Sequence, residues 1–223
     1  LDNVCLKELH CHIGSQIFDI EPFVTAAEIM IDFMAKIKSE LGAVISELNL
    51  GGGFGIMYTT DDGPVPYKYF VDKVSVAVKA KCAEHGLPVP FIYIEPGRSV
   101  VGEAGITLYT VGGKKKIPNV RTYVSIDGGM TDNIRYALYQ SAYTIVNASK
   151  ADKPADEVVT IAGKCCESGD LVQEHTKVAD VQVGDILAVL STGAYNYSMA
   201  SNYNRIPRPA IVMVKDGKSR VIV

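Results

Sequence analysis

The segment ISELNLGGGFG, residues 45–55, is an apolar run that passes into a series of glycines. This pattern predicts a short buried strand followed by a tight turn. Residues 66–86 then repeat apolar side chains at helical spacing and end in glycine, which predicts an amphipathic helix. FIYIEPG, residues 91–97, predicts the next strand. Two strands joined through a helix form a parallel βα unit, so this stretch indicates an α/β fold.

The same order of elements precedes residue 45. ELHCHIG, residues 8–14, is a short run that ends in glycine and predicts a strand. Residues 21–42 follow with apolar side chains at helical spacing and a glycine at the end, and they predict a second amphipathic helix.

The spacing between the predicted strands is compatible with a barrel. His12 and Gly51 lie 39 residues apart, and Gly53 and Glu95 lie 42 residues apart. A βα unit in a (β/α)₈ barrel takes roughly 31 residues, and insertions lengthen it. We therefore expect residues 1–105 to form three successive βα units of a parallel sheet.

The character of the sequence changes after Gly105, where short β-rich runs alternate with Gly, Asp and Pro. These runs cover residues 105–113, 121–129, 157–172, 185–192 and 210–223. A polar, tyrosine-rich stretch, TDNIRYALYQSAY, interrupts them. We therefore expect residues 106–223 to form a second, all-β domain.

Composition limits the possible functions. The chain has 223 residues, 48% of them hydrophobic, which is enough for a real core. A formal net charge of −3 gives no electrostatic footprint for nucleic acid. No segment approaches the roughly 20 apolar residues of a membrane span, and the first residues lack a signal-peptide pattern. We expect a cytoplasmic protein with neither a nucleic-acid nor a membrane partner, and a plastid location stays open for a eukaryotic source.

The cysteines do not form a recognisable site. They lie at positions 5, 11, 82, 165 and 166, without a CxxC pair or a Cys/His pair at zinc-finger spacing. Neighbouring Cys165 and Cys166 could bond only through a strained ring. We therefore expect free thiols and no metal site.

Polar, glycine-rich sequence follows each of the three predicted strands, as HIGSQ, GGGFG and EPGRS. The loops after the strands of an α/β barrel converge on one face and carry the active site. Gly51, Gly52 and Gly53 offer successive backbone N–H groups to a phosphate, although glycines also suit a plain tight turn. Ser15 could bind the same phosphate or cap a turn.

Other candidates also have two interpretations. His12 fits a core histidine as well as a functional one. Glu95 and Arg98 could form an internal salt bridge, or the carboxylate could hold a proton on a heterocyclic nitrogen. Arg135 and Tyr139 would share one face of a short helix, which is either functional or simply exposed. Tyr195 could reach a phosphate or substrate, or it could be a loop residue without a functional role.

Taken in order, HIGSQ, GGGFG, EPGRS, DGGMTDNIRYALY, CCESGD and GAYNYSMASNYN resemble the fold-type III pyridoxal phosphate decarboxylases. GGGFG and EPGR are common to that family, whereas CESGD followed by the GAYNYSMASNYN pattern resembles its diaminopimelate decarboxylase branch. The resemblance covers residues 8–210.

The resemblance implies a fold and a reaction. The fold is an alanine racemase-like (β/α)₈ TIM barrel followed by a C-terminal β-barrel or sandwich domain that contributes to the substrate site and the dimer interface. The reaction is the pyridoxal 5'-phosphate-dependent conversion of meso-2,6-diaminopimelate to L-lysine and CO₂, the last step of lysine biosynthesis. The implied assembly is a homodimer with shared active sites.

The resemblance also implies a role for each matching position. Glu95 pairs with the ring nitrogen of the cofactor, and Glu167 recognises the amino group at the far end of the substrate. Catalytic roles fall to Cys166, as proton donor, and to His12. The cofactor-binding positions are His12, Ser15, Gly51, Gly52, Gly53, Glu95, Gly97, Arg98 and Tyr195. The substrate-binding positions are Arg98, Arg135, Tyr139, Glu167 and Tyr195.

One departure from the family is large. The family attaches its cofactor to a lysine on an early barrel strand in a motif like YAxKAN, and no such strand occurs here. Lys79 lies in a superficially similar run but belongs to the middle of a predicted helix. We therefore expect a C-terminal fragment that lacks the first half of the barrel and is inactive or weak alone, while its full-length parent is the enzyme.

Two alternatives stay open. The parent could be another fold-type III decarboxylase that acts on ornithine, arginine or a carboxylated polyamine. The chain could also be a non-catalytic homologue that regulates a complete relative by dimerising with it.

Overall fold

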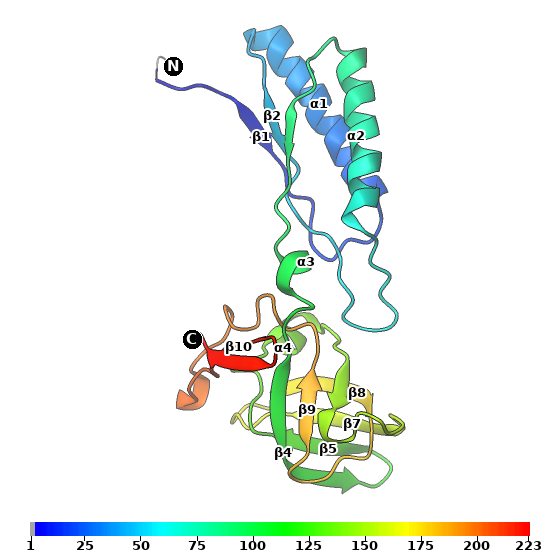
Figure 1. Cartoon of the computed structure of the whole chain (residues 1–223), viewed down its shortest axis with the longest axis vertical. Coiled ribbons are helices and arrows are strands. Elements are labelled where there is room, and N and C mark those ends of the chain that lie inside the picture. Colours follow the sequence, from blue (N-terminus) through cyan, green and yellow to red (C-terminus); the bar gives the residue numbers. More distant parts are fainter. Residues whose placement is uncertain (1–2) are drawn as a thin grey trace. The chain divides into compact units, whose positions relative to one another are not determined.

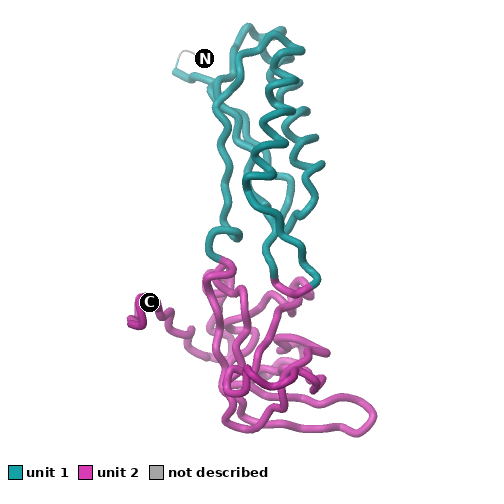
Figure 2. The backbone as a smooth tube through the Cα atoms, turned by 45° about the vertical axis from the view of Figure 1, so that its right-hand side comes forward, with its two compact units in different colours: residues 1–57, 61–101 teal, residues 58–60, 102–223 magenta. Residues whose placement is uncertain are grey.

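The computed structural model describes residues 3–223, which divide into two compact units. The first unit comprises residues 1–57 and 61–101, and the second comprises residues 58–60 and 102–223 (Figure 2). The chain crosses between the units at Met57/Tyr58, at Thr60/Asp61 and at Val101/Gly102. Each unit has its own sheet.

The first unit is a three-stranded parallel sheet with two long helices packed on one face (Figure 1). The strands follow the sheet order β1-β2-β3. The elements are β1 (Glu8–His10), α1 (Glu21–Leu41), β2 (Glu47–Asn49), α2 (Tyr67–Glu84), β3 (Phe91–Tyr93) and the short α3 (Arg98–Val101). This arrangement confirms the three predicted βα units.

The strands are shorter than predicted because the ladder ends at His10, Asn49 and Tyr93, before the glycines are reached. The last residues of the three strands are neighbours across the sheet, with His10 beside Asn49 and Asn49 beside Tyr93. Beyond them the backbone still connects neighbouring segments, since the Glu95 N–H donates to the Gly51 carbonyl at 2.7 Å. The helices begin and end within two residues of their predicted limits, and α1 stops where Gly42 adopts a left-handed φ of 69°.

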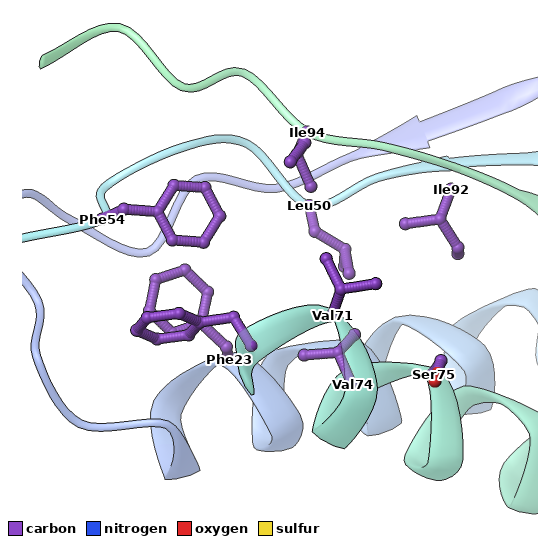
Figure 3. Close-up of a pocket in the computed structure, with 9 residues that line it drawn as sticks. Phe23, Leu50, Phe54, Val71, Val74, Ser75, Ile92 and Ile94 are labelled. Carbon is purple, nitrogen blue, oxygen red and sulfur yellow. The ribbon is translucent and has the colours of Figure 1, made fainter. Parts of the chain in front are cut away.

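The core of the first unit lies between the helices and the sheet. Ala27 and Ile31 of α1 and Leu48 of β2 are fully buried. The Phe23 ring stacks on Phe54, with centroids 5.2 Å apart. An apolar pocket of about 90 Å³ lies beside this pair (Figure 3). Its lining residues are Phe23, Leu50, Phe54, Phe70, Val71, Val74, Ser75, Ile92 and Ile94.

The second unit is built on a six-stranded sheet in the order β6-β9-β4-β5-β7-β8. The edge strands β6 and β8 approach each other, so the sheet curls toward a barrel as expected. The sheet strands are β4 (Thr107–Ile117), β5 (Arg121–Ile126), β6 (Ile145–Asn147), β7 (Glu157–Ala162), β8 (Leu171–Val178) and β9 (Ile186–Val189). The other elements are α4 (Arg135–Tyr139), η1 (Ala148–Lys150), η2 (Tyr203–Arg205) and the hairpin strands β10 (Val212–Lys215) and β11 (Lys218–Val221).

The β-rich run predicted at residues 157–172 contains two strands with a loop between them. β7 ends at Ala162, a loop carries the CCESGD sequence, and β8 begins at Leu171. Glycines at both ends of the loop favour this interruption. β6 was missed because its three residues are too few for a period-two pattern to show.

An ion pair and two hydrogen bonds meet at Asp185, which directly precedes β9. Lys150 Nζ lies 2.8 Å from Asp185 Oδ2, and the Asn147 amide and the Gln182 N–H donate to the same oxygen at 3.0 and 2.9 Å. The side chain of Asp185 is only 13% exposed. The Lys150 ammonium and these donors lower the pKa of Asp185 from 3.8 to about 2.

We expect Asp185→Asn to lower the free energy of unfolding at pH 7 by roughly 1–3 kcal/mol, because it removes a charge-assisted hydrogen bond. Because the pKa of Asp185 is lower in the folded state than in the unfolded state, the ionised carboxylate stabilises the fold above pH 4. This stabilisation is lost as the pH falls toward 2. Urea denaturation at pH 7, 4 and 3 should therefore show a shrinking difference between the wild type and the variant. The exposed Asp152→Asn serves as control, and a difference independent of pH would contradict this account.

Candidate active site

The loops that follow β1, β2 and β3 meet at one end of the sheet. A Cβ on Gly52 would lie 2.2 Å from the Glu95 carbonyl oxygen, and one on Gly53 would lie 2.4 Å from the Gly14 carbonyl oxygen. Such contacts exclude any side chain at both positions. The glycines therefore bring HIGSQ, GGGFG and EPGRS into backbone contact, which is the convergence that the sequence predicted.

Glu95 lies in a polar cluster at this end of the sheet. Asn49 Nδ2 donates to Glu95 Oε1 at 3.0 Å, and His10 Nε2 lies 3.3 Å from Oε2. The hydrogen bond from Asn49, followed by that from His10, lowers the pKa of Glu95. The result is an exposed, ionised carboxylate in a fixed orientation, and it does not form the internal salt bridge with Arg98 that the sequence left open.

Two of the three glycine amides are used inside the protein. The Gly51 N–H donates to Asn49 Oδ1 at 2.9 Å, and the Gly52 N–H donates to His12 Nδ1 at 3.3 Å. Phosphate binding by the Gly51 and Gly52 amides stays a prediction, and it would require these N–H groups to exchange their present acceptors for the anion. Of the three, Gly53 alone has no chain acceptor among the described residues.

A cationic group lies at the same end of the sheet. Arg98, at the start of α3, is 9% exposed, and its Nη2 donates to the Ser15 hydroxyl at 2.8 Å. The preceding Gly97 is exposed, and its carbonyl accepts the Val100 N–H at 3.1 Å. A guanidinium, a hydroxyl and a glycine amide together form a donor set suited to an anion.

The second unit contains a buried arginine surrounded by tyrosines. Arg135 in α4 is 8% exposed. Its guanidinium carbon lies 5.6–5.8 Å from the ring centroids of Tyr58, Tyr139 and Tyr195. Arg135 and Tyr139 thus share a face of α4, as their spacing predicted.

Arg135 has few polar partners. Its Nη2 contacts the Ser141 hydroxyl at 3.4 Å, while Nε is buried without a hydrogen bond. None of the carboxylates in residues 3–223 forms a salt bridge with it. Burial of an unpaired charge is costly, so this site is suited to an anionic ligand.

The CCESGD loop presents its two cysteines differently. Cys165 is partly buried, and burial followed by the neighbouring Asp170 raises the pKa of its thiol. Cys166 is exposed. Glu167 is also exposed, and its Oε1 accepts the Gly169 N–H at 3.1 Å. The loop therefore offers one accessible thiol beside one accessible carboxylate.

The predicted site residues fall into two groups, one in each unit. Each group also contains residues that were not predicted from the sequence. His10 and Asn49 contact Glu95 in the first unit, and Tyr58 contacts Arg135 in the second. Their partners are distant in sequence, so no local pattern pointed to them. For Asn49, the position two residues before the glycines is the only available signal.

The structure also describes the cysteines, the possible metal-ligating groups and the helices. All five cysteines are free thiols. Residues 3–223 contain no group of three His, Cys, Asp or Glu side chains arranged for a metal ion. No helix in the described part of the chain has the length and apolar character needed to cross a membrane.

Comparisons with known proteins point to one family. The family model "Pyridoxal-dependent decarboxylase, pyridoxal binding domain" matches residues 1–102. The diaminopimelate decarboxylase of Bacillus subtilis is 51% identical over 222 residues, which cover 100% of this chain and 51% of that protein. That of Bacillus methanolicus is 52% identical over 215 residues, which cover 96% of this chain and 50% of that protein.

A solved structure agrees with these matches. The diaminopimelate decarboxylase of M. jannaschii in co-complex with L-lysine superposes with a TM-score of 0.86 and 38% sequence identity. The match covers 95% of this chain and 48% of that one. The chain thus spans about half the length of the relatives it matches. Its first 102 residues are similar to the pyridoxal-binding domain of the pyridoxal-dependent decarboxylases, and nearly its whole length is similar to diaminopimelate decarboxylases.

Proposed function

We propose that this chain supplies cofactor-binding and substrate-binding residues to an enzyme that converts meso-2,6-diaminopimelate to L-lysine and CO₂. The whole protein would act as a homodimer with shared active sites. The observation that carries the proposal is Arg135, a buried guanidinium for which the described residues provide no carboxylate.

Arg135 is suited to a substrate carboxylate. A guanidinium binds both oxygens of a carboxylate in a fixed geometry, and surrounding aromatic rings hold its plane in place. Glu167 is suited to the amino group at the other end of the same molecule. Recognition at both ends favours diaminopimelate over shorter amino acids, because a shorter ligand leaves one polar group unpaired.

The first unit fits pyridoxal phosphate, the cofactor of its family. Glu95 offers an ionised carboxylate for the pyridine nitrogen, and its pKa is already low before any ligand binds. Arg98, Ser15 and the Gly53 amide offer donors for the phosphate, and exposed His12 is available beside the ring. When bound, the cofactor supplies an electron-withdrawing ring that accepts the electrons left by the departing carboxylate.

Cys166 is our candidate for the proton donor. An acid is needed to deliver a proton to the α-carbon after CO₂ leaves, and a thiol is a suitable general acid. Cys166 is exposed, whereas Cys165 is partly buried and its N–H faces the Asp170 carboxylate. Tyr139 and Tyr195 line the Arg135 site and would orient the substrate.

The test is a chimera in which this chain replaces the 222 matched residues of the Bacillus subtilis relative. We expect its kcat/KM for meso-diaminopimelate to exceed those for ornithine and arginine by at least about 100-fold, since each unpaired polar group costs on the order of 1–3 kcal/mol. A preference for ornithine or arginine would instead assign another decarboxylase. A folded chimera that is inactive on all three and inhibits the complete relative would indicate a regulator.

A further inference from the structure

The peptide group of Cys166 is held by a segment far along the chain. Its N–H donates to Asn204 Oδ1 at 2.6 Å, and its carbonyl accepts the Tyr203 hydroxyl at 3.3 Å. Both partners belong to η2, in the tyrosine-rich stretch after β9. Hydrogen bonds therefore hold the backbone of Cys166 on both sides of its Cα, although its side chain is exposed.

A second anchor fixes the loop from within. The carboxylate of Asp170 is 3% exposed and accepts the Cys165 N–H at 2.7 Å and the Met130 N–H at 2.6 Å. A Cβ on Gly163 would lie 2.2 Å from this carboxylate, so glycine is required there. Asp170 thus ties the residue before Cys166 to the buried body of the unit.

We propose that Asn204 is a positioning residue that sets the orientation of Cys166. The inference rests on the proposed function, in which Cys166 delivers a proton. Asn204 has a left-handed φ of 52°, a conformation that glycine and asparagine tolerate best. Glycine lacks an acceptor, so asparagine is suited both to the backbone and to the hydrogen bond.

The expected consequence follows from the geometry of the loop. The loop runs between Gly163 and Gly169, and within residues 3–223 only the side chains of Asp170 and Asn204 accept the N–H groups of its two cysteines. Without Asn204 the Cys166 N–H loses its acceptor and only the weaker Tyr203 contact restrains this residue, while Cys165 stays anchored. A shift of about 1 Å at a catalytic group can lower the rate by about 100-fold.

Amide hydrogen exchange of the 223-residue chain tests the contact without any assay of activity. Asn204→Gly removes the acceptor and leaves the backbone unstrained, so exchange at Cys166 should accelerate by at least about 3-fold while Cys165 stays protected. Asn119→Gly is the matched control, because Asn119 also has a left-handed φ, of 59°, in an exposed turn. Asn204→Asp keeps an acceptor and should retain protection.

Kinetics of the same variants in the chimera test the role. We expect Asn204→Gly to lower kcat by about 10- to 100-fold with KM changed less than about 3-fold, and Asn204→Asp to recover most of the loss. Unchanged exchange at Cys166, or a kcat equal to that of the Asn119→Gly control, would overturn the inference. Faster exchange in a chimera that never forms lysine would instead count against the proposed function alone.

Discussion

In the chimera, Cys166→Ala is expected to form lysine about 10²- to 10⁴-fold more slowly than the parent, while Cys165→Ala keeps most of the rate. A positioned general acid contributes a factor of this size, and alanine cannot donate a proton. Initial rates of lysine release from meso-diaminopimelate measure the difference.

The two neighbouring cysteines provide a matched pair. Both substitutions remove one thiol from the same loop, so a general disturbance of the loop would affect them alike. They differ in environment, since the Cys165 thiol is partly buried and its pKa is raised, whereas Cys166 is exposed. Equal losses in the two variants would show that the wrong thiol has been chosen.

Arg135→Met is expected to reduce kcat/KM for meso-diaminopimelate by roughly 30-fold to a few thousand-fold, because loss of one partner of a buried charged contact costs about 2–5 kcal/mol. Methionine has a similar length and packs well against aromatic rings, so the tyrosine-lined site should keep its shape. Steady-state kinetics of the chimera provide the measurement.

The exposed Arg220→Met, in the terminal hairpin, is the control for loss of one positive charge. It is expected to leave kcat/KM unchanged within about 2-fold, because a distant surface charge is screened by salt. If Arg135→Met behaved like this control, Arg135 would not bind the substrate, and the principal support for the proposed function would be lost.

Local sequence was sufficient to predict the parallel first unit. Apolar spacing and terminal glycines placed α1 and α2 within two residues of their observed limits. The strands were predicted too long, because the apolar pattern extends beyond the residues that form the ladder. In the second unit, residues 157–172 were predicted only as a β-rich run, and the structure divides this run into β7, the CCESGD loop and the start of β8.

The candidate site was also predicted only in part from local sequence. Glu95, Arg98 and Arg135 were identified from motifs, because each lies beside glycines or in a recognisable short run. The residues that contact them were not identified, because these partners are distant in sequence. Asn49 lies 46 residues from Glu95, and Tyr58 lies 77 residues from Arg135. Contacts of this length depend on the fold and leave no periodic signal in one sequence.

The most direct test is the yield of lysine and CO₂ from meso-diaminopimelate by the chimera supplied with pyridoxal phosphate. We predict one lysine and one CO₂ for each substrate molecule consumed, with both products lost together in Arg135→Met. A folded chimera that binds pyridoxal phosphate but releases neither product would contradict the account.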